Sequence, residues 1–418
     1  AFEQTFPESL ENLERLVQDV HYDIDTELKL PRFNPERPAV EELRERSEAG
    51  LKKRGLTSSL YQERLDQELA VIHQMGFDDY FLIVWDLLRF GRSQGYYMGM
   101  GRGSAVGSLV AYALEITGID PVKNNLLFER FLNLERYTMP DIDIDIPDVY
   151  RPEFIRYVRD RYGTLHAAQI VTYSTFGAKQ AIRDVFKRFG VAEYELTNIT
   201  KKIRFGDSLS TAYEKNIAFR QIINSKLEYQ KAFDIAKKIE GNPRQTSVHA
   251  AGVVISAAPL DEYVPVQNSN EDGFVTQYDK DNIEELGLLK MDFLGLRTLT
   301  VMGEALRLIK ENHGIDLDLD AIPLDDQASC ELLSRGETAG VFQLESEGIT
   351  KLVMDLKPEH FEDLIPLVAL YRPGPLGSGM VEDFIKRRHK EKEVTYLHPI
   401  LEPILEDTFG VILYQEQV

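Results

Sequence analysis

The stretch Pro140-Asp-Ile-Asp-Ile-Asp-Ile-Pro147 decides the fold, because aspartate and isoleucine alternate through it without interruption. Alternate residues of a strand share a face, so the pattern predicts a strand over 139–146 with isoleucines toward a core and three aspartates on the other side. Like charges on one face repel unless cations lie among them. The pattern therefore predicts a site for hard divalent cations, and the alternative is a solvated edge strand whose charges prevent aggregation.

A second apolar run, residues 286–296, carries Lys290 and Asp292 two positions apart. In a strand this spacing puts both on one face, and an unpaired charge there would be expensive to bury. One interpretation is a buried Lys–Asp ion pair. The other holds if this strand lies beside Asp141 and Asp143, in which case Asp292 is a third metal ligand and Lys290 a phosphate partner.

A glycine-rich run begins at residue 99 and contains Gly101, Arg102, Gly103 and Ser104. Glycines let a backbone approach a ligand closely, and arginine and serine donate to phosphate oxygens. The run opens a predicted helix, whose N–H groups favour an anion, and Ser104 is able to cap that helix. The alternative is tight helix packing through Gly103 and Gly107.

Basic residues gather in one part of an acidic chain. The sequence has 418 residues with 48 Lys and Arg against 69 Asp and Glu, a formal charge of −21. That charge argues against a protein that coats nucleic acid nonspecifically, but a local basic surface could still follow phosphates. A solvated helix face is the alternative. The basic residues singled out are Lys179, Arg183, Lys187, Arg188, Lys201 and Lys202.

Two further residues stand out. Arg372 precedes Pro-Gly-Pro, which predicts a rigid turn that holds the arginine stiffly, as a triphosphate contact requires. His249 precedes Ala-Ala-Gly-Val-Val, and without a visible partner it is interpreted as a structural histidine.

Periodicity predicts the organisation of the chain. Helices are expected over 38–95, and strand-bearing segments over 96–172 and 248–296 flank several short helices at 174–240. Helices dominate again after residue 296, and the last residues, 410–418, are expected to form an apolar strand leading into something further, which marks the chain as a fragment.

Composition limits the class of protein. The longest apolar stretch is far shorter than the roughly 20 residues of a membrane span, and Cys330 is the single cysteine, so no disulfide framework exists. The N-terminus lacks a signal-peptide pattern, and a cytoplasmic location is expected.

Several motifs in order resemble the alpha subunits of bacterial DNA polymerase III, the family C replicative polymerases, from about residue 30 to the end. They are Gly101-Arg-Gly-Ser104, Leu127-Phe-Glu-Arg-Phe131, Met139-Pro-Asp-Ile-Asp143, Lys290-Met-Asp-Phe-Leu-Gly-Leu-Arg-Thr298, Val341-Phe-Gln-Leu-Glu345, Arg372-Pro-Gly-Pro-Leu376 and Ile412-Leu-Tyr-Gln-Glu-Gln417.

The resemblance implies an α+β multidomain protein with a nucleotidyltransferase-type palm of mixed sheet, an inserted helical thumb and mainly helical fingers. The expected boundaries are palm at 30–172 and 248–297, thumb at 173–247 and truncated fingers at 298–418. Residues 1–29 would be an N-terminal segment that holds at most the tail of a missing PHP domain.

The implied activity is template-directed DNA synthesis, in which a deoxynucleotide passes from dNTP to a primer 3′-hydroxyl. Asp141, Asp143 and Asp292 would hold two Mg²⁺ ions as catalytic and metal-binding residues. The implied nucleotide-binding residues are Gly101, Arg102, Gly103, Ser104, Lys290 and Arg372.

The implied partners are primer-template DNA, held mainly by the thumb bases, and in the full-length protein a sliding clamp and other replisome subunits, with no membrane. A metal-dependent nuclease and a noncatalytic replisome scaffold are the alternatives. The first would need no triphosphate cradle, and the second should have lost one of the three aspartates. The missing domains leave open whether this chain is active by itself.

Overall fold

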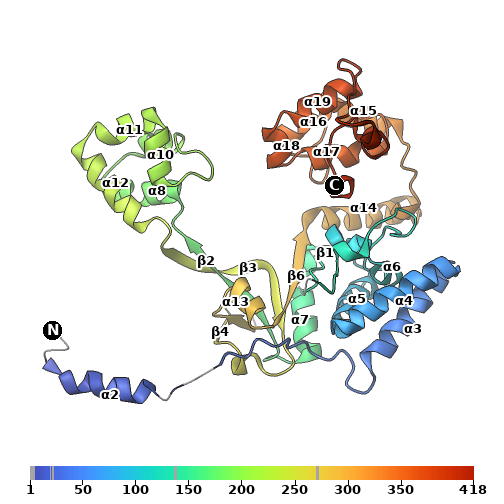
Figure 1. Ribbon diagram of the computed structural model, residues 1–418, viewed down its shortest axis with the longest axis horizontal. Coiled ribbons are helices and arrows are strands. Elements are labelled where there is room, and N and C mark those ends of the chain that lie inside the picture. The colour runs from blue at the N-terminus through green and yellow to red at the C-terminus, as the bar shows by residue number, and fades with distance from the viewer. Residues whose placement is uncertain (1–4, 19, 21–22, 136–138, 270–272) are drawn as a thin grey trace. The chain divides into compact units, whose positions relative to one another are not determined.

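The chain divides into two compact units, Ala1–Thr300 and Val301–Val418, and each is described by itself (Figure 1). The expected N-terminal segment 1–29 contains positions that lie outside the described residues. The computed structural model describes residues 5–18, 20, 23–135, 139–269 and 273–418.

The first unit is built on a six-stranded mixed sheet. Its strands are β1 (Ile144–Pro147), β2 (Ala167–Thr175), β3 (Pro243–Ile255), β4 (Val266–Asn268), β5 (Phe274–Thr276) and β6 (Leu289–Leu296). They lie in the order β1-β6-β3-β2-β5-β4. The β1–β6 and β2–β5 pairs are parallel, and the other pairs are antiparallel. This sheet and its helices confirm the mixed α+β class.

Strand β1 is shorter than the sequence predicts. The predicted core face is confirmed, since Ile142, Ile144 and Ile146 are all buried. The strand begins only at Ile144, however, because the N–H of Ile142 donates to the hydroxyl of Tyr80 at 3.0 Å instead of to a neighbouring strand. Pro140 has no N–H to donate. The prediction of a strand over the whole of 139–146 is therefore wrong for its first half.

Helices pack on the inner face of the sheet. Phe154 of α7 lies against Phe293 of β6, with ring centroids 6.3 Å apart, inside the main core. The predicted helices over 38–95 are confirmed as three, and Gly76, with φ of +75°, follows the second. The α-helices of the first unit outside the insert are α2 (Pro7–Gln18), α3 (Ala39–Lys53), α4 (Ser59–Gln74), α5 (Asp78–Ser93), α6 (Leu109–Ala113), α7 (Arg151–Tyr162), α13 (Lys280–Glu285) and α14 (Arg297–His313), which continues into the second unit.

Five helices between β2 and β3 form a core of their own, which includes Ile182, Phe186, Phe219 and Phe233. This confirms the prediction of a helical insert. The helices are α8 (Ala178–Arg188), α9 (Glu193–Thr200), α10 (Leu209–Lys215), α11 (Ile217–Asn224) and α12 (Leu227–Ile239).

In the described residues of the second unit, every regular element is a helix and none is a strand. Its α-helices are α15 (Gln327–Ser334), α16 (Glu347–Leu356), α17 (Leu364–Leu370), α18 (Pro373–Gly377), α19 (Met380–Arg388) and α20 (Glu402–Leu405). The 3₁₀-helices of the whole chain are η1 (Gly103–Gly107), η2 (Phe128–Arg130), η3 (Asp148–Tyr150), η4 (Leu260–Glu262), η5 (Leu319–Ala321), η6 (Phe361–Asp363), η7 (Pro399–Leu401), η8 (Glu406–Thr408) and η9 (Gln415–Gln417). No helix in the described ranges has both the length and the apolar character to cross a membrane.

Two predictions for the second unit are wrong. The end of the chain forms no strand, because the N–H groups of Leu413 and Tyr414 donate to the side chain of Gln417 and so bond locally. The expected rigid turn after Arg372 is instead the short helix α18, which is compatible with proline because its first N–H groups need no partner inside the helix.

Candidate active site

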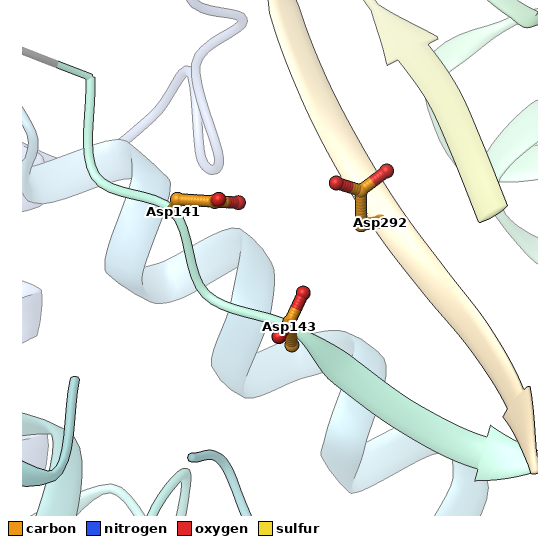
Figure 2. Close-up of side chains that lie close together, drawn as sticks. All are labelled: Asp141, Asp143 and Asp292. Carbon is orange, nitrogen blue, oxygen red and sulfur yellow. The ribbon is translucent and has the colours of Figure 1, made fainter. Parts of the chain in front are cut away.

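Three aspartates from distant parts of the chain converge beside the sheet. Asp141 and Asp143 lie in the extended segment that leads into β1, and Asp292 lies in β6. Ile144 pairs with Phe293 in the parallel β1–β6 pair, so Asp143 comes beside Asp292. One carboxylate oxygen from each residue lies within 4.8 Å of the others, and Figure 2 shows the three side chains around a common space. The predicted convergence is confirmed, and the roles of these residues stay predictions.

The cluster holds more negative charge than its protein contacts balance. Burial raises the pKa of Asp143; Arg102 opposes this effect, and the carboxylates of Asp141, Asp145 and Asp292 add to it. One oxygen of Asp292, Oδ1, is buried and has no hydrogen-bond partner among the described residues. A buried acceptor without a partner is costly, and a cation among these oxygens would satisfy it. The three carboxylates therefore fit a hard divalent metal ion.

Lys290 occupies the same face of β6 as Asp292. Its Nζ lies 2.9 Å from Oδ2 of Asp292 and 3.0 Å from Oε1 of Glu284 in α13. Burial alone would lower the pKa of Lys290, but the hydrogen bonds to Asp292 and Glu284 outweigh it and raise that pKa. The ion pair considered from the sequence is thus present, and Glu284 is a partner that the spacing did not indicate.

The glycine-rich run lies along the outer edge of β1. The N–H of Gly99 donates to the backbone oxygen of Asp145 at 3.0 Å. The Nε of Arg102 lies 3.1 Å from Oδ2 of Asp145, and its guanidinium lies 3.6 Å from Asp143. Burial raises the pKa of Asp145 while Arg102 opposes the rise. Asp145 therefore pairs with Arg102 instead of joining the cluster, although strict alternation predicts three equivalent aspartates.

Gly103 and Gly107 differ in what a side chain at each position would meet. A Cβ on Gly107 would lie 2.5 Å from the carbonyl oxygen of Leu127, so packing requires this glycine, as the alternative interpretation held. Gly103 has φ of +69° and open space around the position of a Cβ, so packing does not explain it. The helix that follows the run, α6, is capped by Ser108, whose side chain accepts from the N–H of Ala111. Ser104 is exposed and is not the cap.

Two residues that support the site were missed from the sequence. Tyr80 is fully buried in α5, and its hydroxyl fixes the backbone between Asp141 and Asp143 through Ile142. Burial raises the pKa of Tyr80, the hydrogen bond from Ile142 opposes this, and the nearby aspartates add to the rise. No periodicity connects residues about 60 positions apart, so no signal in the sequence could have identified this contact.

Glu68 is the second missed residue. Its Oε2 accepts from the hydroxyl of Ser108 at 3.0 Å and from the N–H of Val110 at 3.1 Å, and its Oε1 accepts from Arg64 at 2.6 Å. Burial raises the pKa of Glu68, and the backbone N–H of Leu109, the guanidinium of Arg64 and the N–H of Val110 oppose the rise. Glu68 stands next to Leu69 on the apolar face of α4, and a charge on such a face is the signal that could have revealed it.

The basic residues of the insert lie outside its core. Those on α8 stand opposite the buried face of that helix, which carries Ile182 and Phe186. Arg183 forms an ion pair with Glu193, so its charge is already balanced. Arg372, which was predicted to bind nucleotide, belongs to the second unit and is exposed at the start of α18. Among the residues predicted to contact DNA, Lys202 is half-buried. The other predicted DNA-contacting residues are exposed, namely Lys179, Lys187, Arg188 and Lys201.

Together, the mixed sheet, the carboxylate cluster and the arginine- and lysine-bearing segments beside it define an α+β protein with a candidate divalent-metal centre. Residues 41–295 match the family model described as the bacterial DNA polymerase III alpha NTPase domain. Residues 298–418 match the model described as the finger domain of the same subunit. The chain belongs to the family of bacterial DNA polymerase III alpha subunits.

Curated relatives named DNA polymerase III subunit alpha agree. The one from Streptococcus pyogenes serotype M1 is 59% identical over 419 residues, covering 100% of this chain and 40% of the relative. The one from Halalkalibacterium halodurans is 46% identical, covering 100% of this chain and 38% of the relative. The one from Staphylococcus aureus is 48% identical over 370 residues, covering 88% and 34%. The chain thus spans about 40% of the length of the first of these relatives.

Proposed function

We propose that this chain carries the catalytic centre of a template-directed DNA polymerase, which transfers a deoxynucleotide from dNTP to the 3′-hydroxyl of a primer. The observation that carries the proposal is the convergence of Asp141, Asp143 and Asp292, with a buried oxygen of Asp292 left without a partner among the described residues. Membership in the polymerase family supports the same activity.

In this proposal the three aspartates hold two Mg²⁺ ions, which would supply a lowered hydroxyl pKa and neutralisation of phosphate charge when bound. The chain's own residues orient the reactants. Tyr80 fixes the backbone that presents Asp141 and Asp143, and the β1–β6 pairing fixes Asp292 beside them. Positioning and electrostatic stabilisation account for most catalysis of phosphoryl transfer, so this preorganisation is the protein's contribution.

Nucleotide binding is assigned to Gly101–Ser104, Lys290 and Arg372. Arg102 and Lys290 both contact carboxylates of the cluster, so each can exchange a carboxylate oxygen for a phosphate oxygen of dNTP at the same place. The open backbone at Gly103 suits close approach of a phosphate. Arg372, in the segment assigned to the fingers, would add a further contact to the triphosphate of dNTP.

The remaining assignments follow the same family. We assign residues 30–172 and 248–297 to a palm, 173–247 to a thumb that holds DNA phosphates, and 298–418 to fingers. Primer-template DNA is the macromolecular partner, and a sliding clamp and other replisome subunits would join in the full-length protein in the cytoplasm.

The test changes the carboxylates one at a time in a version of the protein extended to the length of its relatives. Asp141→Asn or Asp143→Asn should lower single-nucleotide incorporation by about 10²–10³-fold or more, the range seen when one preorganised electrostatic group is lost. Affinity for primer-template, measured by fluorescence anisotropy, should change little, because the lost interaction acts on the transition state.

The exposed Asp160 of α7 supplies the matched control, since Asp160→Asn removes the same charge away from the cluster. Equal loss of DNA binding and turnover in the Asp143→Asn variant would indicate a structural role. Degradation of the primer without any extension would favour the nuclease alternative.

A further inference from the structure

A large bulge in β3 lies directly beside Asp292. Gln169 of β2 pairs with Val253 and Val171 pairs with Val248, so two steps along β2 correspond to five along β3. Gly252, inside this bulge, pairs with Asp292 in the antiparallel β3–β6 pair. Bulges next to active sites commonly re-aim a side chain, which raises the question of which side chain this one presents.

The re-aimed side chain is His249. Its Nδ1 accepts hydrogen bonds from the N–H groups of Ala251, at 3.2 Å, and Gly252, at 2.7 Å. A Cβ built on Gly252 would lie 3.0 Å from the same Nδ1. Directly opposed residues of an antiparallel pair project to one face. The imidazole therefore lies over Gly252 on the face of the sheet that carries Asp292.

These contacts fix the tautomer of the ring. Because Nδ1 accepts from two backbone N–H groups, the proton of the neutral imidazole is on Nε2. No described residue forms a hydrogen bond with Nε2, and the side chain is only half-buried. His249 thus presents one oriented donor, the Nε2–H group, beside the aspartate cluster.

The strand order shows on which flank of β6 the Nε2–H group of His249 lies. The glycine-rich run binds the outer edge of β1 through Gly99, while His249 belongs to β3, so the two lie on opposite flanks of β6 and Asp292. Phosphoryl transfer places the attacking and leaving oxygens roughly in line on opposite sides of phosphorus. With the triphosphate at the glycine-rich run, the flank of His249 is the side of the primer.

The surroundings of His249 favour a phosphate. None of the residues of β2 and β3 is acidic, although the chain contains 69 Asp and Glu residues. Toward the helical insert, β3 exposes the polar side chains of Gln245, Thr246 and Ser247. An acid-free, hydroxyl-bearing ribbon that leads from the basic insert to His249 suits a DNA backbone.

We propose that the Nε2–H of His249 donates to a backbone phosphate of the primer strand next to its 3′ end, and so positions the primer. The inference rests on the proposed polymerase function and adds a residue to the primer side of the site. It also accounts for Gly252, because any side chain there would push the imidazole away.

Three variants separate the proposed donation by Nε2–H from the structural role of Nδ1, which accepts the N–H groups of Ala251 and Gly252 in the bulge. His249→Asn keeps an acceptor at the place of Nδ1 but has no donor at the place of Nε2, His249→Gln places an amide donor near Nε2, and His249→Ala removes both. Each is combined with a primer that carries a methylphosphonate at its last linkage, or five linkages upstream as a control. Affinity for primer-template is measured by fluorescence anisotropy.

With the unmodified primer, His249→Ala and His249→Asn should each weaken binding about tenfold, as expected for a hydrogen bond to a charged group, while His249→Gln retains part of the affinity. The terminal methylphosphonate should weaken wild type by a similar factor and the Ala and Asn variants hardly at all. The upstream methylphosphonate should affect every protein equally.

The proposal is overturned if His249→Asn binds primer-template as tightly as wild type does, or if the effects of the variant and of the terminal methylphosphonate on affinity simply add. Either result would mean that His249 serves only to accept the N–H groups of the bulge. The readout is binding, so it remains valid if incorporation fails. Binding without incorporation contradicts only the proposed function, whereas a chain that does not bind primer-template contradicts both.

Discussion

At the scale of single residues, Tyr80 joins the main core to the aspartate cluster through one hydrogen bond to Ile142. Tyr80→Phe leaves that backbone N–H buried and without its acceptor, which should cost about 1–3 kcal/mol in the free energy of unfolding. Because the freed segment carries Asp141 and Asp143, Mn²⁺ affinity at the cluster should fall as well. Urea denaturation and titration with Mn²⁺ measure the two effects.

Tyr61→Phe is the matched control. The hydroxyl of Tyr61 donates to Oδ2 of Asp120 at a distance of 2.6 Å, and neither residue belongs to the aspartate cluster. It should lower stability without changing Mn²⁺ affinity. Unchanged Mn²⁺ binding in a destabilised Tyr80→Phe protein would show that Tyr80 serves the core alone.

Glu68 predicts a pH dependence of stability. Burial raises its pKa above the ordinary value of 4.5, so the folded state holds this proton to a higher pH than the unfolded state does. Between the two pKa values the unfolded state binds fewer protons, and stability therefore falls as pH rises through the window that begins near the ordinary value. The penalty is complete above the folded-state pKa.

Glu68→Gln cannot titrate, so it isolates this contribution. The stability of wild type minus that of Glu68→Gln, from urea midpoints between about pH 4 and 7, should decrease as pH rises. A difference that grows with pH would mean that the ion pair with Arg64 outweighs burial.

Residue chemistry was easier to predict from the sequence than residue contacts. Alternation identified Asp141, Asp143 and Asp292 because charge inside an apolar strand is locally visible. It could not separate Asp145, whose pairing with Arg102 depends on how a distant loop lies on β1. Tyr80 and Glu68 escaped for the same reason, since each acts on a segment far away in the sequence.

At the scale of elements, the glycine-rich run separates two kinds of glycine. Gly107→Ala places a Cβ 2.5 Å from a backbone oxygen, so the backbone must shift, at a cost of about 1–3 kcal/mol. Gly103→Ala meets open space and pays only for its positive φ, about 1 kcal/mol. If the run binds a triphosphate, Gly103→Ala should nevertheless raise the KM for dNTP more than Gly107→Ala does.

Thermal denaturation and nucleotide kinetics on both variants make the comparison. A larger KM effect from Gly107→Ala than from Gly103→Ala would assign the run to packing. Arg102→Ala should raise the same KM with little change in primer-template affinity.

Element boundaries show where periodicity stops being informative. The helix at 59–74 was predicted because its apolar residues recur at helical spacing. The helices of the insert were predicted because that segment is rich in both charges and shows no strand signal. The first half of the predicted strand at 139–146 failed because Ile142 donates to Tyr80, and the predicted terminal strand failed because Gln417 captures the N–H groups of two residues. In both places a side chain took a backbone hydrogen bond that a strand would have needed.

At the scale of the whole molecule, the chain consists of two units, with separate cores represented by Phe154 in the first and Phe384 in the second. The three aspartates all belong to the first unit. A ligand that binds the cluster therefore contacts only the first unit, Ala1–Thr300, and should stabilise that unit directly.

Calorimetry should show this selectivity. A ligand that binds only the folded state stabilises it by about 2.7 kcal/mol at a hundredfold excess over its Kd. Mg²⁺ should therefore raise the melting temperature of the first unit and leave that of the second nearly unchanged. Because a chain of net charge −21 is also stabilised when salt screens its charges, KCl at matched ionic strength is the reference.

The triple variant Asp141→Asn, Asp143→Asn and Asp292→Asn should lose the Mg²⁺-specific shift and keep the response to KCl. An equal Mg²⁺ shift in both units, or in the triple variant, would mean that the ion acts on overall charge and not on the aspartate cluster.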